Sequence, residues 1–491
     1  MIMRRALAAF ALALIVCGPV WADGLPEELK ARRERVMASL GGDTIAILWS
    51  APERPYSRDV EYEYRQDSDL LYLTGITQPE TILVLMPGNR TKREILFIRP
   101  ADARREHWNG HVLTADEVTA RTGIATVYET PAFDDFLSAT FSQFPFGQKS
   151  REAAMTDPEY DTFFAAVRAS QAKMALRLPP LPGRDEPLDA ERAFARQARD
   201  RFLDVSFVNL APLIAALRQI KTPYEQSVFA RSVEISSDAH IAGMRAARPG
   251  RFEYEVEAAI EQVYLANGAM APGYPSIVGS GPNATTLHYN ASSRRMEDGD
   301  LLLVDAAANY QGITGDITRT YPVNGRFTAA QRDIYEIVLA SQEAGMKAAR
   351  AGNRTLDIEK AAAAAVKPAL LKLGLITDAS GDQFRTWYTH GICHWIGMDV
   401  HDVGDYRNPL APGMAFTIEP GIYIRPTALD NLPDTPENRA FKEKVKPAVE
   451  RYANIGVRIE DSFLLTDGGL VMLSKKVPRT VAEVERLLAA R

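Results

Sequence analysis

The sequence is poor in cysteine. Its 491 residues include two cysteines, Cys17 and Cys393, and Cys17 lies in an apolar segment at the N-terminus. If that segment is removed, no intramolecular disulfide can form, so the mature chain depends on its hydrophobic core for stability. Cys393 lies among histidines and could be a nucleophile or a metal ligand, but a small buried apolar residue is the favoured interpretation.

An excess of positive charge is also absent. The chain has 57 Lys and Arg against 63 Asp and Glu, which gives a formal net charge of −6. Because phosphate groups are bound by basic surfaces, this mild acidity argues against a nucleic acid partner. Low-complexity tracts are missing too, and a chain of this length exceeds one typical core. The composition therefore predicts two globular domains of unequal size.

The N-terminal apolar run is too short for a stable membrane span. It extends over residues 6–17, after Arg4 and Arg5, whereas a transmembrane helix needs ~20 apolar residues. Together with the small residue Ala22, this run predicts a secretory signal peptide over residues 1–22. Its removal changes the formal net charge from −6 to −8, because two arginines and no acid are lost. A buried N-terminal helix and acylation at Cys17 are disfavoured alternatives. We expect an exported protein, located in the bacterial periplasm.

The next part of the chain alternates apolar strand-like and helical segments. This pattern predicts an α/β domain over residues 23–210, followed by a second domain over residues 211–491. We expect helices over residues 27–40 and 132–144. The expected strands cover residues 44–49, 70–73, 81–85 and 95–98.

The second domain contains an internal repeat. Capping boxes begin at Thr222 and at Thr328, 106 residues apart, and each opens a long amphipathic helix. Each of these helices is followed by a second one that ends at a glycine, Gly268 and Gly374, at the same spacing. Two matching helical hairpins, each followed by strands, predict two halves related by pseudo-symmetry.

Two aspartates, Asp305 and Asp316, stand within the segment LLLVDAAANYQGITGDITRTYPV. Apolar β-formers flank both, and a turn between Tyr310 and Gln311 would make a β-hairpin with the aspartates directly opposite each other, their Cβ atoms roughly 4.5–5.5 Å apart. Two carboxylates this close repel each other unless they share a proton or a cation neutralises them. The segment therefore predicts a metal site.

Further residues with suitable chemistry follow in the second domain. Glu419 ends an apolar strand, and Glu460 lies in an alternating strand that has Arg458 on the same face. His390 and His394 have the spacing of a zinc-protease helix, but Gly391 replaces the glutamate of that motif, so a strand or tight loop is favoured. The other histidines beside acids in this domain are His288 and His401.

The order and spacing of these residues resemble a metallopeptidase family. The segments HGICHWIG, TIEPG and GVRIED, together with His288, Asp305 and Asp316, are similar to the family with the pita-bread fold, which includes aminopeptidase P, prolidase and methionine aminopeptidase. YRQDSDLLYLTGI, residues 64–76, resembles the first domain of aminopeptidase P. The resemblance implies an α/β N-terminal domain and an α+β pita-bread catalytic domain of the creatinase/aminopeptidase type with pseudo-two-fold symmetry.

The resemblance also implies a role for each residue. Asp305 would bind one metal ion, Asp316 and Glu460 would bridge two ions, and His394 and Glu419 would complete the second site. The carboxylate-rich ligand set favours Mn²⁺ over Zn²⁺ or Co²⁺. A metal-bridging hydroxide would attack the scissile carbonyl. The implied catalytic histidines are His288 and His401, with His390 in support, and Arg458 would orient Asp305.

The function that this resemblance implies is that of an Xaa-Pro aminopeptidase. Such an enzyme releases the N-terminal residue of short peptides that have proline in second position. Prolidase, which cleaves Xaa-Pro dipeptides, is the alternative, and a metal-free binding protein or a creatinase-like enzyme on the same fold is disfavoured because all five ligand positions carry metal-binding residues. We expect a homo-oligomer, either a dimer or a tetramer. Residues 426–452 look longer than the family's usual connection and predict a surface excursion.

Overall fold

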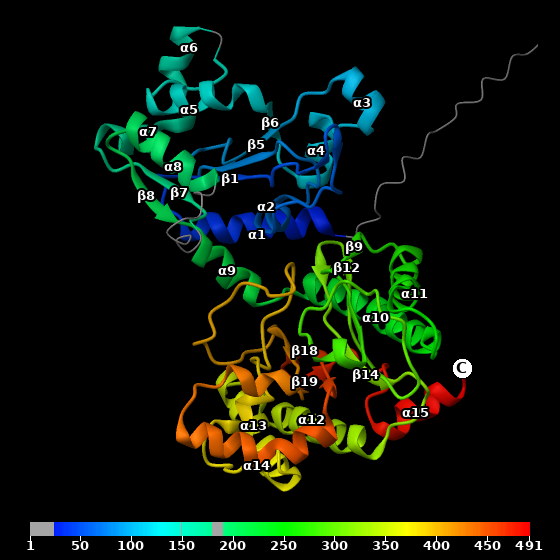
Figure 1. Cartoon of the computed structure of the whole chain (residues 1–491). Coiled ribbons are helices and arrows are strands. Elements are labelled where there is room, and N and C mark those ends of the chain that lie inside the picture. The colour runs from blue at the N-terminus through cyan, green and yellow to red at the C-terminus, as the bar shows by residue number, and fades with distance from the viewer. Residues whose placement is uncertain (1–23, 149, 179–189) are drawn as a thin grey trace, which may run out of the picture.

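The computed structural model describes residues 24–148, 150–178 and 190–491, and it consists of two domains (Figure 1). An α/β domain forms the N-terminal part, and a larger α+β domain follows, as the sequence predicts. The predicted signal peptide and the proline-rich segment over residues 179–187 lie outside the described residues. Within the described residues, no helix is both long and apolar enough to cross a membrane.

The N-terminal domain is a mixed six-stranded sheet with helices on both faces. Its strand order is β6-β5-β4-β1-β7-β8. The strands are β1 (Thr44–Trp49), β4 (Ile82–Leu85), β5 (Glu94–Ile98), β6 (Thr126–Glu129), β7 (Lys173–Leu176) and β8 (Ser206–Asn209). The helices are α1 (Leu25–Ser39), α2 (Ser68–Thr74), α3 (Ala103–Asn109), α4 (Ala115–Thr122), α5 (Phe133–Phe141), α6 (Arg151–Thr156), α7 (Asp161–Arg168) and α8 (Ala190–Arg201), and a small hairpin is formed by β2 (Pro55–Ser57) and β3 (Val60–Glu61).

Alternation along the central strand β1 separates two cores. Ile45 and Ile47 pack with residues of α5 and α7 on one face of the sheet. Ala46 and Leu48 face the other way, in a core that is continuous with that of the second domain. Figure 1 shows α1 and α2 between the sheet and the second domain. One face of β1 thus contributes to the hydrophobic core that joins the two domains.

The predicted strand over residues 70–73 is wrong, because these residues belong to helix α2. The Asp67 side chain caps this helix by accepting hydrogen bonds from the backbone N–H groups of Asp69 and Leu70. Gly75 ends it in the left-handed conformation, with φ 64°. Asp67 and Gly75 are local signals for the two ends of a helix, whereas the apolar run between them is also typical of a strand.

Helix α9 (Ala211–Gln219) lies between the two domains, and the second domain contains both predicted helical hairpins. The first is α10 (Pro223–Ala246) with α11 (Glu253–Ala266), and the second is α12 (Ala329–Ala348) with α13 (Thr355–Leu373). The capping boxes at Thr222 and Thr328 are both formed, which confirms this part of the prediction. The position of the domain boundary at residue 210 stays a prediction.

Two long, interrupted β-hairpins lie between these helices. In the first, β11 (Leu301–Asp305) pairs with β14 (Thr318–Pro322), and β12 (Ala308–Tyr310) pairs with β13 (Ile313–Thr314). In the second, β15 (Ala415–Ile418) pairs with β18 (Asp461–Thr466), and β16 (Gly421–Tyr423) pairs with β17 (Gly456–Arg458). Within each hairpin, the two ladders share one register across the break.

The turn of the first hairpin lies one residue later than predicted. Gln311 and Gly312 form its centre, both with positive φ, 50° and 83°, as two-residue hairpin turns require. Asp305 is therefore opposite Thr318 and not opposite Asp316. The aspartates still share a face, because Asp316 is two residues from Thr318, but they are diagonal neighbours. The prediction of direct opposition is wrong.

The two hairpins meet at one point. Thr318 and Glu460 exchange backbone hydrogen bonds of 3.3 and 3.1 Å in an isolated bridge. Extending the second hairpin's register across its break places Glu419 opposite Glu460, and the Ile459 N–H donates to the Pro420 carbonyl in the same register. The breaks in both hairpins thus bring acidic residues to the crossing.

The remaining elements of the second domain are β9 (Ala271–Pro272), β10 (Ile277–Ser280), β19 (Gly469–Met472) and α15 (Val481–Ala489), with 3-10 turns at Gly281–Thr285 and Gln383–Thr386.

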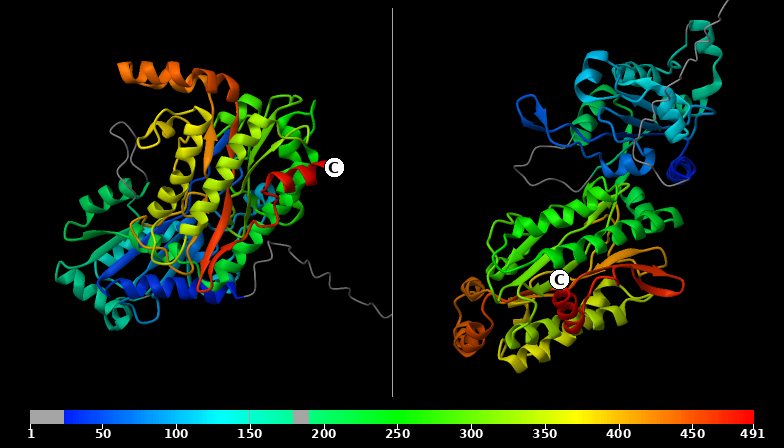
Figure 2. Two further views of the ribbon diagram at one scale, coloured as in Figure 1. Left: turned by 90° about the horizontal axis from the view of Figure 1, so that it is seen from below. Right: turned by 90° about the vertical axis from the view of Figure 1, so that its right-hand side faces the viewer.

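The long connection of the second hairpin contains a 3-10 turn, Pro426–Asn431, and helix α14 (Pro436–Tyr452). Phe441, Val445 and Val449 of this helix are buried, whereas its other face is exposed. Figure 2 shows α14 projecting from the edge of the second domain, in orange. The expected surface excursion over residues 426–452 is therefore present, and its helix has an apolar stripe that packs on the domain.

Candidate metal centre

A cavity of about 540 Å³ lies where the two hairpins cross. Its size is within the range of small-ligand sites. All nine site residues singled out from the sequence, the positioning arginine included, line this cavity together: His288, Asp305, Asp316, His390, His394, His401, Glu419, Arg458 and Glu460. Tertiary structure thus gathers residues spread over both halves of the domain.

Asp305 and Asp316 are joined by a tyrosine that the sequence did not single out. The hydroxyl of Tyr274 lies 2.6 Å from Oδ1 of each aspartate. Arg458 donates a 2.6 Å hydrogen bond from Nη2 to Oδ2 of Asp305. Thus one oxygen of Asp305 is held by the buried guanidinium, and the other faces the cavity beside Asp316.

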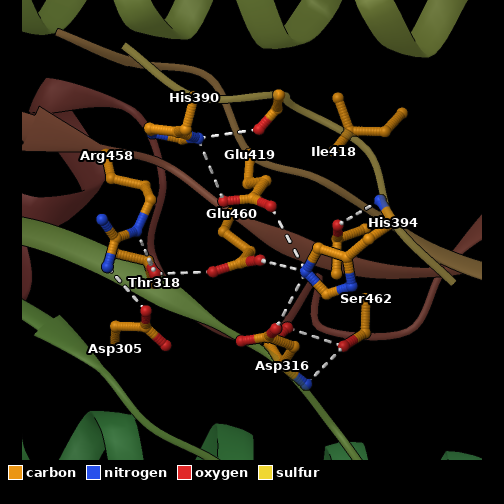
Figure 3. Close-up of polar contacts among 12 residues, drawn as sticks. Asp305, Asp316, Thr318, His390, His394, Ile418, Glu419, Arg458, Glu460 and Ser462 are labelled. Carbon is orange, nitrogen blue, oxygen red and sulfur yellow. Dashed lines mark hydrogen bonds and ion pairs between the residues drawn. The ribbon is translucent and has the colours of Figure 1, made fainter. Parts of the chain in front are cut away.

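His394 stands at the centre of the carboxylates (Figure 3). Its Nδ1 lies 3.0 Å from the carbonyl oxygen of Trp395, which makes Nδ1 the donor in the neutral ring. Its Nε2 faces three carboxylate oxygens, at 3.2 Å from Glu419, 3.4 Å from Asp316 and 3.9 Å from Glu460. In this tautomer Nε2 carries a lone pair, so a cation is needed to make its position favourable.

The acids of the site fit a divalent cation. Ligand atoms of Asp316, His394 and Glu460 lie within 4.8 Å of one another. Oε2 of Glu460 accepts a 2.6 Å hydrogen bond from the Thr318 hydroxyl, whereas Oε1 is buried and has no hydrogen-bond partner among the described residues. A buried carboxylate oxygen without a partner is costly. A cation held by this oxygen, by His394 and by the neighbouring acids would remove that cost.

The titration behaviour of the cluster shows the same need for positive charge. Burial, and then the charge of Asp305, raises the pKa of Asp316 to about 6. Burial and the charge of Asp316 raise the pKa of Glu460 well above its usual value. Burial opposes the charge of His394, but Asp316 and Glu419 outweigh it and raise the pKa of its imidazolium. Each of these shifts favours additional positive charge at the cluster, from a proton or from a bound cation.

A chain of hydrogen bonds connects Arg458 to His390. Nη1 of Arg458 donates to the Tyr423 hydroxyl at 2.8 Å, and that hydroxyl lies 2.8 Å from Nε2 of His390. Nδ1 of His390 lies 2.7 Å from the Gly391 carbonyl oxygen, so the ring donates there and accepts from Tyr423. Burial lowers the pKa of His390, which agrees with a neutral ring in this chain.

The other two histidines lie on the exposed rim of the cavity. The rings of His401 and His394 meet edge to face, with centroids 4.5 Å apart. Partial burial and the nearby His394 lower the pKa of His401. His288 lies on the loop after β10 and is exposed. Both can reach a ligand without being held by the acids below them.

Cys393 also lines the cavity wall, but its thiol is buried, and burial raises its pKa well above the usual value. This favours the apolar role over a nucleophile. Sequence reasoning missed Tyr274, Tyr423 and Thr318, whose hydroxyls contact the acids or His390. No spacing signal identifies them, because their partners lie on distant segments.

Comparison with known proteins places these residues in a family context. The chain matches metallopeptidase family M24 over residues 228–467 and the aminopeptidase P N-terminal domain over residues 29–144. An Xaa-Pro aminopeptidase of Escherichia coli (strain K12) is 34% identical over 474 residues, covering 94% of this chain and 98% of the relative. Xaa-Pro aminopeptidase 3 of Homo sapiens is 30% identical over 478 residues, covering 94% and 85%.

Solved structures agree with the sequence comparison. An aminopeptidase of Pseudomonas aeruginosa superimposes with a TM-score of 0.79 at 34% identity, covering 95% of this chain and 98% of the other. Aminopeptidase P of Escherichia coli with the inhibitor Pro-Leu gives 0.76 at 32% identity, with the same coverage. The chain therefore belongs to metallopeptidase family M24 and combines its pita-bread domain with an aminopeptidase P N-terminal domain.

Proposed function

We propose that this protein is a metal-dependent Xaa-Pro aminopeptidase, an exopeptidase that releases the N-terminal residue from peptides with proline in second position. The names of its full-length relatives support this activity. Within the site, the observation that carries the proposal is the position of His394, whose Nε2 faces three buried carboxylates. Such a group of acids around one imidazole suits divalent metal ions.

The proposed centre holds two ions, with Asp305, Asp316, His394, Glu419 and Glu460 as ligands. Mn²⁺ is the proposed native ion because four of the five ligands are carboxylates, and Zn²⁺ and Co²⁺ are the alternatives. When bound, such a pair of ions lowers the pKa of water enough to supply a nucleophile near neutral pH. The carboxylates hold the ions, and Arg458 fixes the orientation of Asp305 through its 2.6 Å hydrogen bond.

The histidines have separate proposed tasks. His288 and His401 stand on the rim, where their ring N–H groups can donate hydrogen bonds to the carbonyl oxygen of the peptide. His390 is less exposed, and its bonds to Tyr423 and Gly391 fix its ring. It therefore supports the wall of the site and shapes the space for the substrate.

Metal analysis combined with a peptide panel tests the proposal. Protein reconstituted with Mn²⁺ is expected to bind two ions per chain and to cleave Arg-Pro-Pro after arginine. Cleavage of Ala-Pro with no cleavage of Arg-Pro-Pro would identify a prolidase. Less than one ion per chain, with no cleavage of either peptide, would favour a metal-free binding protein and overturn the proposal. Activity with Zn²⁺ and Co²⁺, measured in parallel, tests the choice of metal.

Three further features are part of the proposal. Residues 1–22 are proposed as a signal peptide for export to a bacterial periplasm, which N-terminal sequencing of the secreted protein tests. Domain limits at residues 23–210 and 211–491 are tested by limited proteolysis. A homo-oligomer, dimer or tetramer, is tested by light scattering of the purified protein.

A further inference from the structure

A second cavity adjoins the metal cavity on the side of the surface excursion. Its volume is about 780 Å³, and Leu287 lines both cavities. Tyr423 lines the second cavity, while its hydroxyl bonds to His390 and Arg458 in the wall of the first. Leu287 therefore faces both spaces, and Tyr423 connects the wall of the second space to that of the first through its hydroxyl.

A backbone hydrogen bond joins the two segments that form one wall of the second cavity. The Tyr423 N–H donates a 2.9 Å hydrogen bond to the Trp387 carbonyl, which joins the second hairpin to residues 382–389. Across it stands the 3-10 turn Pro426–Asn431, the first part of the excursion. This wall of the cavity therefore belongs to the long connection between β16 and β17.

The charges of this cavity are not all paired. Nε of Arg385 lies 3.6 Å from Asp382. Within the part of the chain that the structure describes, the side chains of Arg425 and Asp430 have no hydrogen bond or ion pair, and both are exposed on the cavity wall. A guanidinium without a partner is suited to a carboxylate, which it can bind through two parallel hydrogen bonds.

A peptide cut at the metal site needs a place for the residues that follow the proline. Leu287 lines both cavities, His288 beside it is exposed on the wall of the metal cavity, and Thr389 is exposed on the wall of the second cavity, so a chain can leave the metal cavity past these residues. A larger cavity of about 1010 Å³ between the domains has no lining residue in common with the metal cavity. The excursion side is therefore the continuous route.

We propose that the cavity between residues 382–389 and 425–432 binds the part of the peptide that follows the proline, and that Arg425 pairs with the C-terminal carboxylate of a short peptide. This rests on the proposed aminopeptidase function. Asp430 lies on the same wall and repels a carboxylate. The two residues therefore have opposite effects on peptides with a free C-terminus, and the proposal predicts the sign of each.

The test measures kcat/KM for Ala-Pro-Ala and Ala-Pro-Ala-Ala, each with a free or an amidated C-terminus, on full-length protein loaded with Mn²⁺. The wild type is expected to prefer the free acid of at least one of the two lengths. R425Q should lower kcat/KM for that free acid about threefold to tenfold and leave the amide unchanged, with a larger effect at low salt. R425K should restore most of the loss, and D430N should raise kcat/KM for the free acid.

Two matched variants complete the design. Arg439 on α14 pairs with Asp434 outside the cavity, so R439Q should leave kcat/KM unchanged for both the free acid and the amide. Arg54 lines the cavity between the domains, and a loss of the preference in R54Q instead of R425Q would overturn the proposal. If the ratio of kcat/KM for the free acid to kcat/KM for the amide is the same in R425Q as in the wild type, the proposal is overturned as well. If the wild type cleaves no proline peptide at all, the proposed function fails rather than the subsite.

Discussion

Replacing Arg218 should destabilise the protein strongly, because this side chain is buried at the contact between the domains. It is 2% exposed. Nη1 donates a 2.6 Å hydrogen bond to Asp69 of the N-terminal domain, and Nη2 lies 2.9 Å from Asp399 and also contacts Asp402. Asp399 and Asp402 flank the segment that carries His401, so the same arginine links the N-terminal domain to the rim of the metal cavity.

The expected loss of stability in the variant R218M follows from the buried carboxylates that lose one of their partners. Methionine retains much of the apolar stem, but Asp69 and Asp402 stay buried, and each keeps one ion-pair partner among the described residues. These are Arg177 at 3.6 Å from Asp69 and Lys221 at 2.9 Å from Asp402. Breaking a buried ion pair costs about 3–5 kcal/mol. Because each acid keeps one partner, we expect a loss of about 3 kcal/mol in the free energy of unfolding, summed over the unfolding transitions.

The pH dependence distinguishes lost charge from lost packing. Burial already raises the pKa of Asp69. At Asp402, burial acts in the same direction, but Lys221 and Arg218 outweigh it and lower the pKa. Without Arg218, both folded-state pKa values rise, so the folded variant takes up protons as the pH falls. The stability deficit of R218M should therefore shrink between pH 8 and pH 5.5, whereas a packing defect would be independent of pH.

Urea unfolding at the two pH values, followed by circular dichroism, measures this effect. The control is R65M, since Arg65 also bonds to Asp399, at 3.0 Å, but its side chain is 60% exposed. An exposed pair is worth at most about 1 kcal/mol. The reasoning is refuted if R218M loses no more stability than R65M, or if its deficit is the same at both pH values.

Three other predictions concern single residues. Asp316→Ala should abolish peptidase activity and weaken metal binding, measured by turnover and bound Mn²⁺, because Asp316 is the proposed bridging ligand; near-normal turnover would contradict that role. His401→Ala should lower kcat about 10²- to 10⁴-fold with metal content unchanged, and loss of metal would mean that His401 is itself a ligand. His240 is buried on α10, with Nε2 2.9 Å from the Ala306 carbonyl oxygen, and burial lowers its pKa to about 4. Its neutral form is therefore favoured on folding, so stability is lost as the pH falls from about 6.5 towards 4. H240Q keeps a hydrogen-bond donor for Ala306. Between pH 7.5 and pH 4.5 its free energy of unfolding, measured with urea, should fall by about 2–3 kcal/mol less than that of the wild type. An equal fall in both proteins would exclude this contribution of His240.

The sequence by itself determined the features that depend on local pattern. Caps at Thr222 and Thr328 and the glycine stops defined both helical hairpins, because capping and amphipathic spacing are properties of neighbouring residues. The order of acids and histidines from His288 to Glu460 identified the family and the set of side chains that share one cavity. Strand β1 lies at the predicted residues for the same reason, since apolar β-formers fill it.

Only the tertiary structure decided how these elements fit together. The turn at Gln311 and Gly312 lies one residue later than predicted, which moves the partner of Asp305 by two residues, from Asp316 to Thr318, and makes the two aspartates diagonal, because hairpin register is set by turn geometry. Residues 70–73 are helical because their apolar side chains fill the core that the N-terminal domain shares with the second domain. The crossing of Thr318 and Glu460, the hydroxyl of Tyr274 between two carboxylates and the buried Arg218 join segments far apart in the chain. Such contacts depend on packing between elements, which no local pattern in one sequence specifies.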